Sequence, residues 1–113
     1  MPKPNNYYEL TDSITDVSTA SSVRFAVPHN GFLREVRTVL AGAISGADAV
    51  ITVSHNGTAL TPTITVANAS SAEGDIDSAG FYRGVSKGDW LEIATGGEST
   101  DTAALGVTVV LSA

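Results

Sequence analysis

The sequence predicts an all-β protein: a single antiparallel β-sandwich or jelly-roll-like barrel of about seven or eight strands, with an extended N-terminal arm. Short apolar–polar alternations recur between turns rich in Gly, Pro and Asn, which is typical of sandwiches and small barrels. No segment with helical periodicity is longer than two turns. The chain of 113 residues has the length of one domain. We therefore predict an arm over residues 1–22 and a β-sandwich domain over residues 23–113.

The N-terminal segment is predicted as an arm because its residues favour extended or irregular backbone. Residues 1–6 combine two Pro with two Asn. Residues 11–22 are rich in Ser, Thr and Asp, so we expect a loop with one short extended piece at 14–17. The arm has three large apolar side chains that we expect to contact a surface: Tyr7, Tyr8 and Leu10.

The sandwich domain is expected to begin with a half-buried strand over residues 23–27, where Val and Phe alternate with other residues. Residues 28–31 (PHNG) form a turn, because Pro fixes φ and Asn-Gly accepts a positive φ. A longer strand over residues 32–41 has no cleanly apolar face. Either it contains a bulge, or both of its faces are covered, one by the core and one by a partner.

Residues 49–85 are predicted to form further strands separated by turns. Residues 49–54 alternate, and the following Asn56-Gly57 predicts a tight hairpin. Residues 63–66 alternate as well. Residues 67–80 are small and acidic, which indicates a loop before a short strand over residues 81–85.

The C-terminal part predicts two more strands. Residues 86–89 (SKGD) form a turn into a strand over residues 90–95. After a Gly-Gly loop, the last strand covers residues 102–112. One face of this last strand is entirely apolar: Leu105, Val107, Val109 and Leu111.

Composition excludes several classes of function. The net charge is −6 and there is no basic run, which disfavours binding to nucleic acid and to anionic membranes. The absence of Cys excludes disulfides and thiolate metal sites. The N-terminus has no apolar signal region, so we expect synthesis in a cytoplasm. The low charged fraction of 16% suits a surface covered by neighbours, and equally suits any Thr-rich β protein.

No catalytic constellation is visible. The histidines, His29 and His55, each precede an Asn-Gly pair, so we expect them to be solvated turn residues. There is no nucleophile elbow and no Gly-rich loop before a helix. We therefore expect no enzyme activity and no cofactor.

The loop over residues 67–80 offers a metal-binding alternative. Glu73, Asp75 and Asp77 alternate there and have the oxygen ligands that Ca²⁺ prefers. They do not match the register of an EF-hand, and a solvated acidic loop is the preferred interpretation.

Trp90 is the most informative aromatic residue. Leu91 and Ile93 are expected to point inward, which turns Trp90 outward. An outward Trp is typical of an interface, a small secondary cluster or a sugar platform. The sugar platform requires other aromatic side chains to assemble near it: Tyr7, Tyr8, Phe81 and Tyr82.

The order of these turns and strands resembles a known family. The relevant stretches are VPHNGFLREVRTVLAGAISGADAVITVSHNGTAL, a loop containing EGDID, VSKGDWLEIATGGEST, and the terminal GVTVVL. Together they resemble the small jelly-roll-like capsid decoration and head-spike-base proteins of tailed bacteriophages. The resemblance covers residues 23–112 and rests on turn signals.

The resemblance implies a structural virion protein on the capsid exterior that forms a homotrimer, in which case the cytoplasm of its synthesis is that of the host. Its implied partners are the major capsid protein, further copies of itself and a head-fibre protein. The alternative is a carbohydrate-binding module or adhesin that contacts a host glycan.

Arg34 and Arg37 lie on opposite faces if their strand is regular. The residues that we expect at the partner interface are Tyr7, Tyr8, Leu10, Arg34, Arg37 and Trp90.

Overall fold

The computed structural model describes residues 7–112, which form strands and loops with no helix. Accordingly, this part of the chain contains no apolar helix of membrane-spanning length. The first six residues of the predicted arm lie outside the described part of the chain. The strands are β1 (Tyr7–Ile14), β2 (Ser21–Ala26), β3 (Gly31–Leu40), β4 (Ala49–His55), β5 (Thr58–Ala59), β6 (Ile64–Val66), β7 (Ile76–Val85), β8 (Trp90–Thr95) and β9 (Leu105–Ser112).

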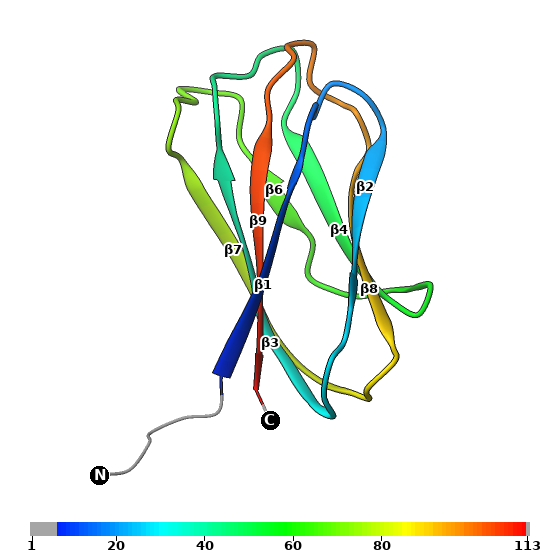
Figure 1. Cartoon of the computed structure of the whole chain (residues 1–113). Helices are drawn as coiled ribbons and strands as arrows, with labels where there is room; N and C mark the ends of the chain where they lie inside the picture. The colour runs from blue at the N-terminus through cyan, green and yellow to red at the C-terminus, as the bar shows by residue number, and fades with distance from the viewer. Residues whose placement is uncertain (1–6, 113) are drawn as a thin grey trace, which may run out of the picture.

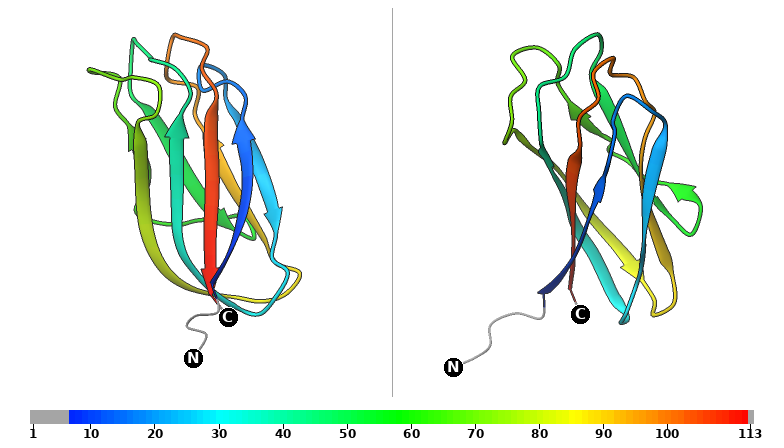
Figure 2. Two further views of the ribbon diagram at one scale, coloured as in Figure 1. Left: turned by 60° about the vertical axis from the view of Figure 1, so that its left-hand side comes forward. Right: turned by 45° about the horizontal axis from the view of Figure 1, so that its top comes forward.

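The strands form two antiparallel sheets packed face to face (Figures 1 and 2). Sheet A has the order β1-β9-β3-β7, and sheet B has the order β2-β8-β4-β5, with β6 also paired to β4. The first four strands alternate between the sheets, and so do β6 to β9. The chain therefore winds around the core as in a jelly roll, which confirms the predicted fold class.

The core lies between the sheets and is made by the inward side chains of alternating strands. The predicted apolar row of β9 is confirmed, because Leu105, Val107, Val109 and Leu111 are all at most 2% exposed. Sheet B provides an equally buried set from β4 and β8: Ile51, Val53, Leu91 and Ile93. Close packing of branched side chains from both sheets holds the two layers together.

The N-terminal segment differs from the predicted arm. Residues 7–14 form β1, which pairs with β9 along its whole length, from Tyr7 opposite Ser112 to Ile14 opposite Leu105. The inward side of β1 contributes Tyr8, Leu10 and Ile14 to the core or its margin. Pairing with the buried strand β9 provides the stability that this polar segment lacks by itself. Residues 7–14 therefore belong to the sandwich.

The predicted loop over residues 67–80 is also shorter than expected. β7 begins at Ile76 and continues to Val85, pairing with β3. Ala79 is buried opposite Val36. The small residues of this strand give little periodic signal, and β3 imposes the extended conformation from outside the segment.

The turns follow the predicted chemistry. Asn56 and Gly57 have φ values of 49° and 89° and connect β4 to β5 in a two-residue hairpin, as Asn-Gly favours. In the turn over residues 86–89, Gly88 has a φ of 93°. The Asp89 amide there donates to the Ser86 carbonyl at 2.9 Å.

The expected bulge in β3 is confirmed between Leu33 and Glu35, where the register shifts against both neighbouring strands. Leu33 and Val36 are three residues apart, yet both are fully buried. A regular strand would turn one of them outward. The bulge therefore keeps β3 in the core on both sides of Arg34.

Substitution along β3 should distinguish core from surface positions. Leu33→Ala should lower the free energy of unfolding by about 2 to 5 kcal/mol, because it leaves a cavity between the sheets. Val39→Ala, on the exposed side of the same strand, should cost about 0.5 kcal/mol or less. Urea unfolding measures both values. Equal costs would contradict the assigned faces of β3.

Candidate functional site

The outer face of sheet A gathers the exposed apolar side chains of the protein. Within residues 7–112 there are four exposed large hydrophobic residues, and all lie on this face: Tyr7, Val39, Ile76 and Tyr82, exposed by 49%, 44%, 67% and 73%. They come from β1, β3 and β7. Exposed apolar residues scattered singly are ordinary, but a shared face indicates an interaction surface.

An arginine–aromatic cluster occupies one end of this face. Phe32 and Tyr82 stack with their ring centroids 4.8 Å apart and an interplanar angle of 5°. The Arg34 guanidinium lies 5.3 Å from the Tyr82 ring centroid and 5.8 Å from that of Tyr7. Cation–π attraction thus holds Arg34 of β3 between rings of β1 and β7. Tyr82 nevertheless remains 73% exposed.

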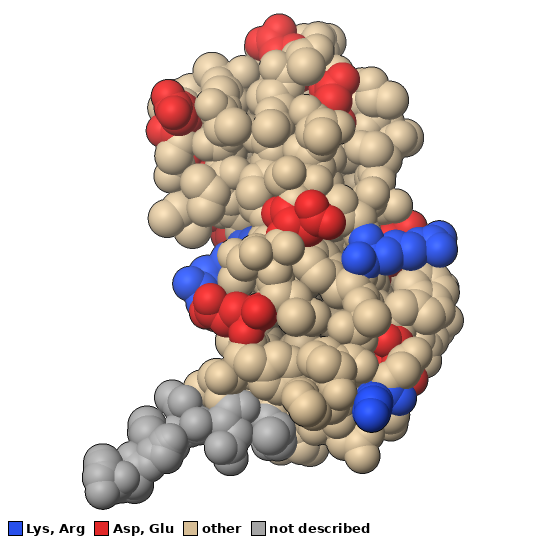
Figure 3. Space-filling model, viewed as in Figure 1, with Lys and Arg blue, Asp and Glu red and all other residues tan. Residues whose placement is uncertain are grey.

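The charges on this face neutralise one another. Arg37 lies 3.3 Å from Glu9 and 3.4 Å from Glu35. These pairs are partly exposed, so they add little stability. Figure 3 shows that most of the visible surface is uncharged and that the Lys and Arg residues lie near Asp or Glu, while the acidic residues at the upper end have no basic neighbour. A locally neutral surface costs less to desolvate than one with unpaired charges.

The structure brings together three of the predicted interface residues: Tyr7, Arg34 and Arg37. The two arginines share the outer face of sheet A, contrary to the expectation for a regular strand, because the bulge shifts the alternation by one residue. Sequence reasoning missed Phe32, Val39 and Ile76 as members of this face. Only the register of β3 against β7 brings Ile76 beside Val39.

Tyr8 and Leu10 point to the other side of β1. Both are half-buried and pack against the core. The Tyr8 hydroxyl donates to the His29 carbonyl at 3.3 Å, and burial raises the pKa of Tyr8. Their contact with a partner stays a prediction.

Trp90 lies on the outer face of sheet B, as the alternation predicted, with Leu91 and Ile93 fully buried beside it. The Arg24 guanidinium covers its ring at 4.8 Å from the centroid. The aromatic residues that a sugar platform at Trp90 would require do not gather around it, because Tyr7 and Tyr82 project from the opposite sheet. The exposed aromatic surface of the protein is therefore on sheet A.

His55 is not the solvated turn residue that the sequence predicted, although His29 is exposed. The His55 side chain is only 11% exposed, and its Nε2 lies 2.8 Å from Asp89 Oδ2. Arg83 Nε donates to His55 Nδ1 at 3.0 Å. This pattern assigns the ring proton to Nε2. The Asp89–His55 pair therefore fixes Arg83 Nε at the edge of β7.

The hydrogen bond from His55 and the Ser86 backbone amide lower the pKa of Asp89 to about 2. Both donors favour the ionised carboxylate. The carboxylate thereby links the turn over residues 86–89 to β4.

The acidic residues of the loop before β7 do not converge. Asp75 accepts a hydrogen bond from the Ala72 amide at 2.9 Å. Burial, together with the nearby Asp75 charge, raises the pKa of Asp77. Across residues 7–112, no three His, Cys, Asp or Glu side chains lie close enough to hold a metal ion. The structure thus does not bring Glu73, Asp75 and Asp77 together as calcium ligands.

Comparison with known proteins gives structural matches only. No protein-family model matches the sequence, and no curated protein matches it. A chain of the Cyanophage Pam1 capsid asymmetric unit has a TM-score of 0.59 and 16% identity, over 99% of this chain and 91% of that chain. A family 35 carbohydrate-binding module from Clostridium thermocellum has a TM-score of 0.54 and 12% identity, over 95% and 91% of the two chains.

A third similar structure is the catalytic unit of a GH87 α-1,3-glucanase from Streptomyces thermodiastaticus, with a TM-score of 0.57 and 16% identity. The match covers 96% of this chain but 26% of the glucanase, so the chain spans about a quarter of that enzyme. At these identities the matches show a shared β-sandwich fold. That fold occurs in a phage capsid protein and in carbohydrate-binding modules alike.

The low pKa of Asp89 predicts an acid-sensitive contribution to stability. Because folding lowers this pKa from its ordinary 3.8 to about 2, the ionised carboxylate stabilises the fold above about pH 4, and the effect is lost as the pH falls toward 2. Asp89→Asn should therefore have a lower Tm than the parent protein at pH 6, and the difference should shrink between pH 4 and pH 2. Circular dichroism melting measures it. A difference that stays constant with pH would contradict the assigned role.

Proposed function

We propose that this chain is a structural virion protein, a capsid decoration or head-spike-base protein that binds the outer capsid surface and self-associates as a trimer. It has no catalytic role in this proposal. Its partners are the major capsid protein, further copies of itself and, in the spike-base form, a head-fibre protein. The observation that carries the proposal is the gathering of all four exposed large hydrophobic residues on the outer face of sheet A.

The chemistry of this face favours a protein partner. Tyr and Arg are enriched at the centres of protein interfaces, and the arginine–aromatic cluster supplies both. Arg37 is paired within the chain, so docking leaves no unpaired cation there. Val39 and Ile76 form a second apolar pair on the same face, separated from the cluster by the ion pairs of Arg37. A flat sheet face of this kind suits another protein surface better than a small ligand.

The comparison supports the virion assignment by analogy of fold. The match to the Cyanophage Pam1 capsid chain covers nearly the whole length of both chains. The absence of basic runs is compatible with a position outside the capsid, away from nucleic acid. A trimer multiplies weak contacts to a repeating lattice into high avidity.

A carbohydrate-binding module is the second candidate function, and one observation favours it. The stacked Phe32–Tyr82 pair and Tyr7 offer exposed ring faces, on which a sugar can stack. The family 35 carbohydrate-binding modules share the fold. Loss of glycan binding in Tyr82→Ser, with an unchanged oligomer, would favour this function over capsid decoration.

Paired variants test the proposed interface. The double variant Val39→Ser/Ile76→Ser should weaken binding to the parent capsid about tenfold or more, because it removes two apolar contacts. Val50→Ser makes the same type of change on the outer face of sheet B and is the matched control. Co-sedimentation with purified capsids measures binding, and light scattering measures the molar mass. An unchanged affinity in the double variant, or a greater loss in the control, would overturn the proposal.

A further inference from the structure

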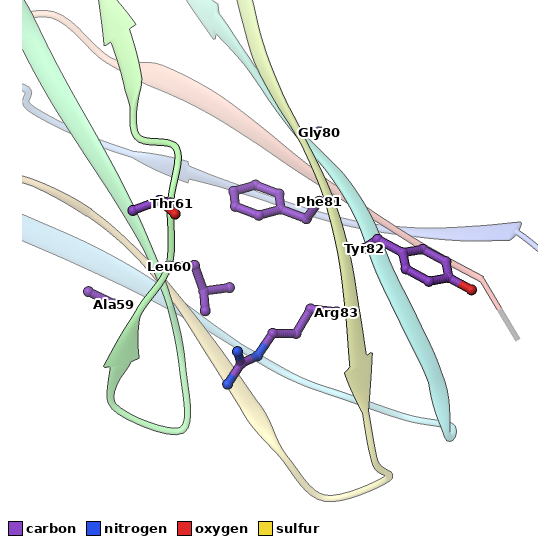
Figure 4. Close-up of a pocket in the computed structure, with 7 residues that line it drawn as sticks. All are labelled: Ala59, Leu60, Thr61, Gly80, Phe81, Tyr82 and Arg83. Atoms are coloured by element: carbon purple, nitrogen blue, oxygen red, sulfur yellow. The ribbon is translucent and has the colours of Figure 1, made fainter.

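A pocket opens at one edge of the sandwich, between β7 of sheet A and the segment that joins β5 to β6 in sheet B. Its volume is about 610 Å³, which is within the range of ligand sites in proteins. The residues that line it are Ala59, Leu60, Thr61, Gly80, Phe81, Tyr82 and Arg83. In Figure 4, Phe81 and Arg83 point from β7 toward Leu60 and Thr61, whereas the Tyr82 ring points away. The pocket therefore has an apolar floor and a guanidinium at its margin.

Arg83 is held in place at this margin. Its Nε donates to His55 Nδ1 at 3.0 Å, and Asp89 holds the His55 ring from the other side at 2.8 Å. The side chain is otherwise exposed, and no carboxylate in the described chain lies within ion-pair distance of it. The two terminal nitrogens of the guanidinium are thus oriented before any ligand arrives, which favours recognition of a carboxylate.

The strand beside the pocket has a free edge. β7 is the last strand of sheet A and pairs only with β3, so the backbone groups on its other side have no strand partner among residues 7–112. Gly80 and Gly84 do not have a positive φ, and an added Cβ would approach no other atom more closely than 3.9 Å. Neither backbone conformation nor internal packing requires glycine there. Both glycines pair with outward-facing residues of β3, so they leave the outer face of sheet A open beside this edge.

From these features we infer that the pocket binds an extended segment of a partner protein, which lies along the free edge of β7 and places a carboxylate on Arg83. The apolar floor made by Leu60 and Phe81 receives an apolar side chain two residues along that segment, because side chains at this spacing share a face with the carboxylate. Addition of a strand to an exposed sheet edge is a common mode of peptide recognition, in which pockets select alternate side chains. The inference rests on the proposed role in protein binding and specifies how part of the partner is held.

The position of the pocket agrees with this partner. Tyr82 borders the pocket, and its ring belongs to the arginine–aromatic cluster on the outer face of sheet A. A partner docked on that face is therefore adjacent to the β7 edge, and one extended segment of it can reach the pocket. The pocket and the face form one continuous surface around β7.

Peptide titration of the ¹⁵N-labelled protein tests the inference. The probes are acetyl-VTETV-amide and its neutral counterpart acetyl-VTQTV-amide, in which the Val side chains share a face with the central residue. The acidic peptide should shift the amide signals of Leu60, Thr61, Phe81 and Arg83 and bind about tenfold more tightly than the neutral one. The preference should weaken as NaCl is raised. A third probe, acetyl-VTQTV with a free C-terminus, distinguishes a chain-terminal carboxylate from a side-chain carboxylate as the preferred group.

Substitutions of Arg83 test whether this residue binds the carboxylate of the peptide. Arg83→Gln should remove the preference for the acidic peptide, and Arg83→Lys, which keeps the charge but loses the planar donor, should retain part of it. Arg24→Gln, on sheet B, is the matched control and should retain all of it. Equal binding of acidic and neutral peptides, no shifts at millimolar peptide, or a preference that survives Arg83→Gln would overturn the inference.

The two proposals can fail separately. If Val39→Ser/Ile76→Ser loses capsid binding but neither peptide binds, the structural role stands and the pocket is not the peptide site. If the acidic peptide binds but the double variant keeps full capsid affinity, the pocket is a peptide site and the outer face of sheet A is not the capsid interface.

Discussion

The structure depends on the contact between the inward row of β9 and sheet B. β9 lies between β1 and β3, and its branched side chains are almost completely shielded from water. This one strand orders both neighbours, because it provides hydrogen bonds to each and apolar surface to both. The polar segment of residues 7–14 becomes a strand only through this pairing. Burial of apolar side chains between the sheets is the main stabilising contribution in a chain with so few charged residues.

The bulge in β3 links this packing to the candidate interaction surface on sheet A. Because the alternation shifts at Arg34, Leu33 and Val36 both enter the core, while Arg34 and Arg37 both face outward. Arg34 then joins rings from β1 and β7, and Arg37 joins two carboxylates. The extra residue, Arg34, therefore has two effects. It keeps the apolar side chains on both sides of the bulge in the core, and it places both arginines on the outer face of sheet A. Bulges commonly re-aim side chains at functional surfaces in this way.

Sequence reasoning predicted the elements whose signals are local. The Asn56-Gly57 hairpin, the strand over residues 90–95 and the apolar row of β9 are all present, since turn chemistry and alternation lie within a few residues. The sequence did not predict β1 or the first half of β7. The small and polar residues of these segments are extended because they pair with neighbouring strands of the sheet. The bulge was one of two explanations left open for β3.

The functional surface was predictable only in part, for the same reason. Tyr7, Arg34 and Arg37 were identified by residue type, but their common location depends on register and on the bulge. Val39 and Ile76 give no signal in sequence, because either could face a core. The link from Arg83 through His55 to Asp89 joins three segments distant in the chain. Only the folded structure brings these groups together.

The central claim is that the outer face of sheet A is covered by protein in the assembled particle. Cryo-electron microscopy of the parent virion tests it most directly. We expect density for a neighbouring subunit against Tyr82, Val39 and Ile76, with Trp90 on the opposite sheet facing away from that contact. A map in which this face is open to solvent and the chain is attached through sheet B would contradict the account.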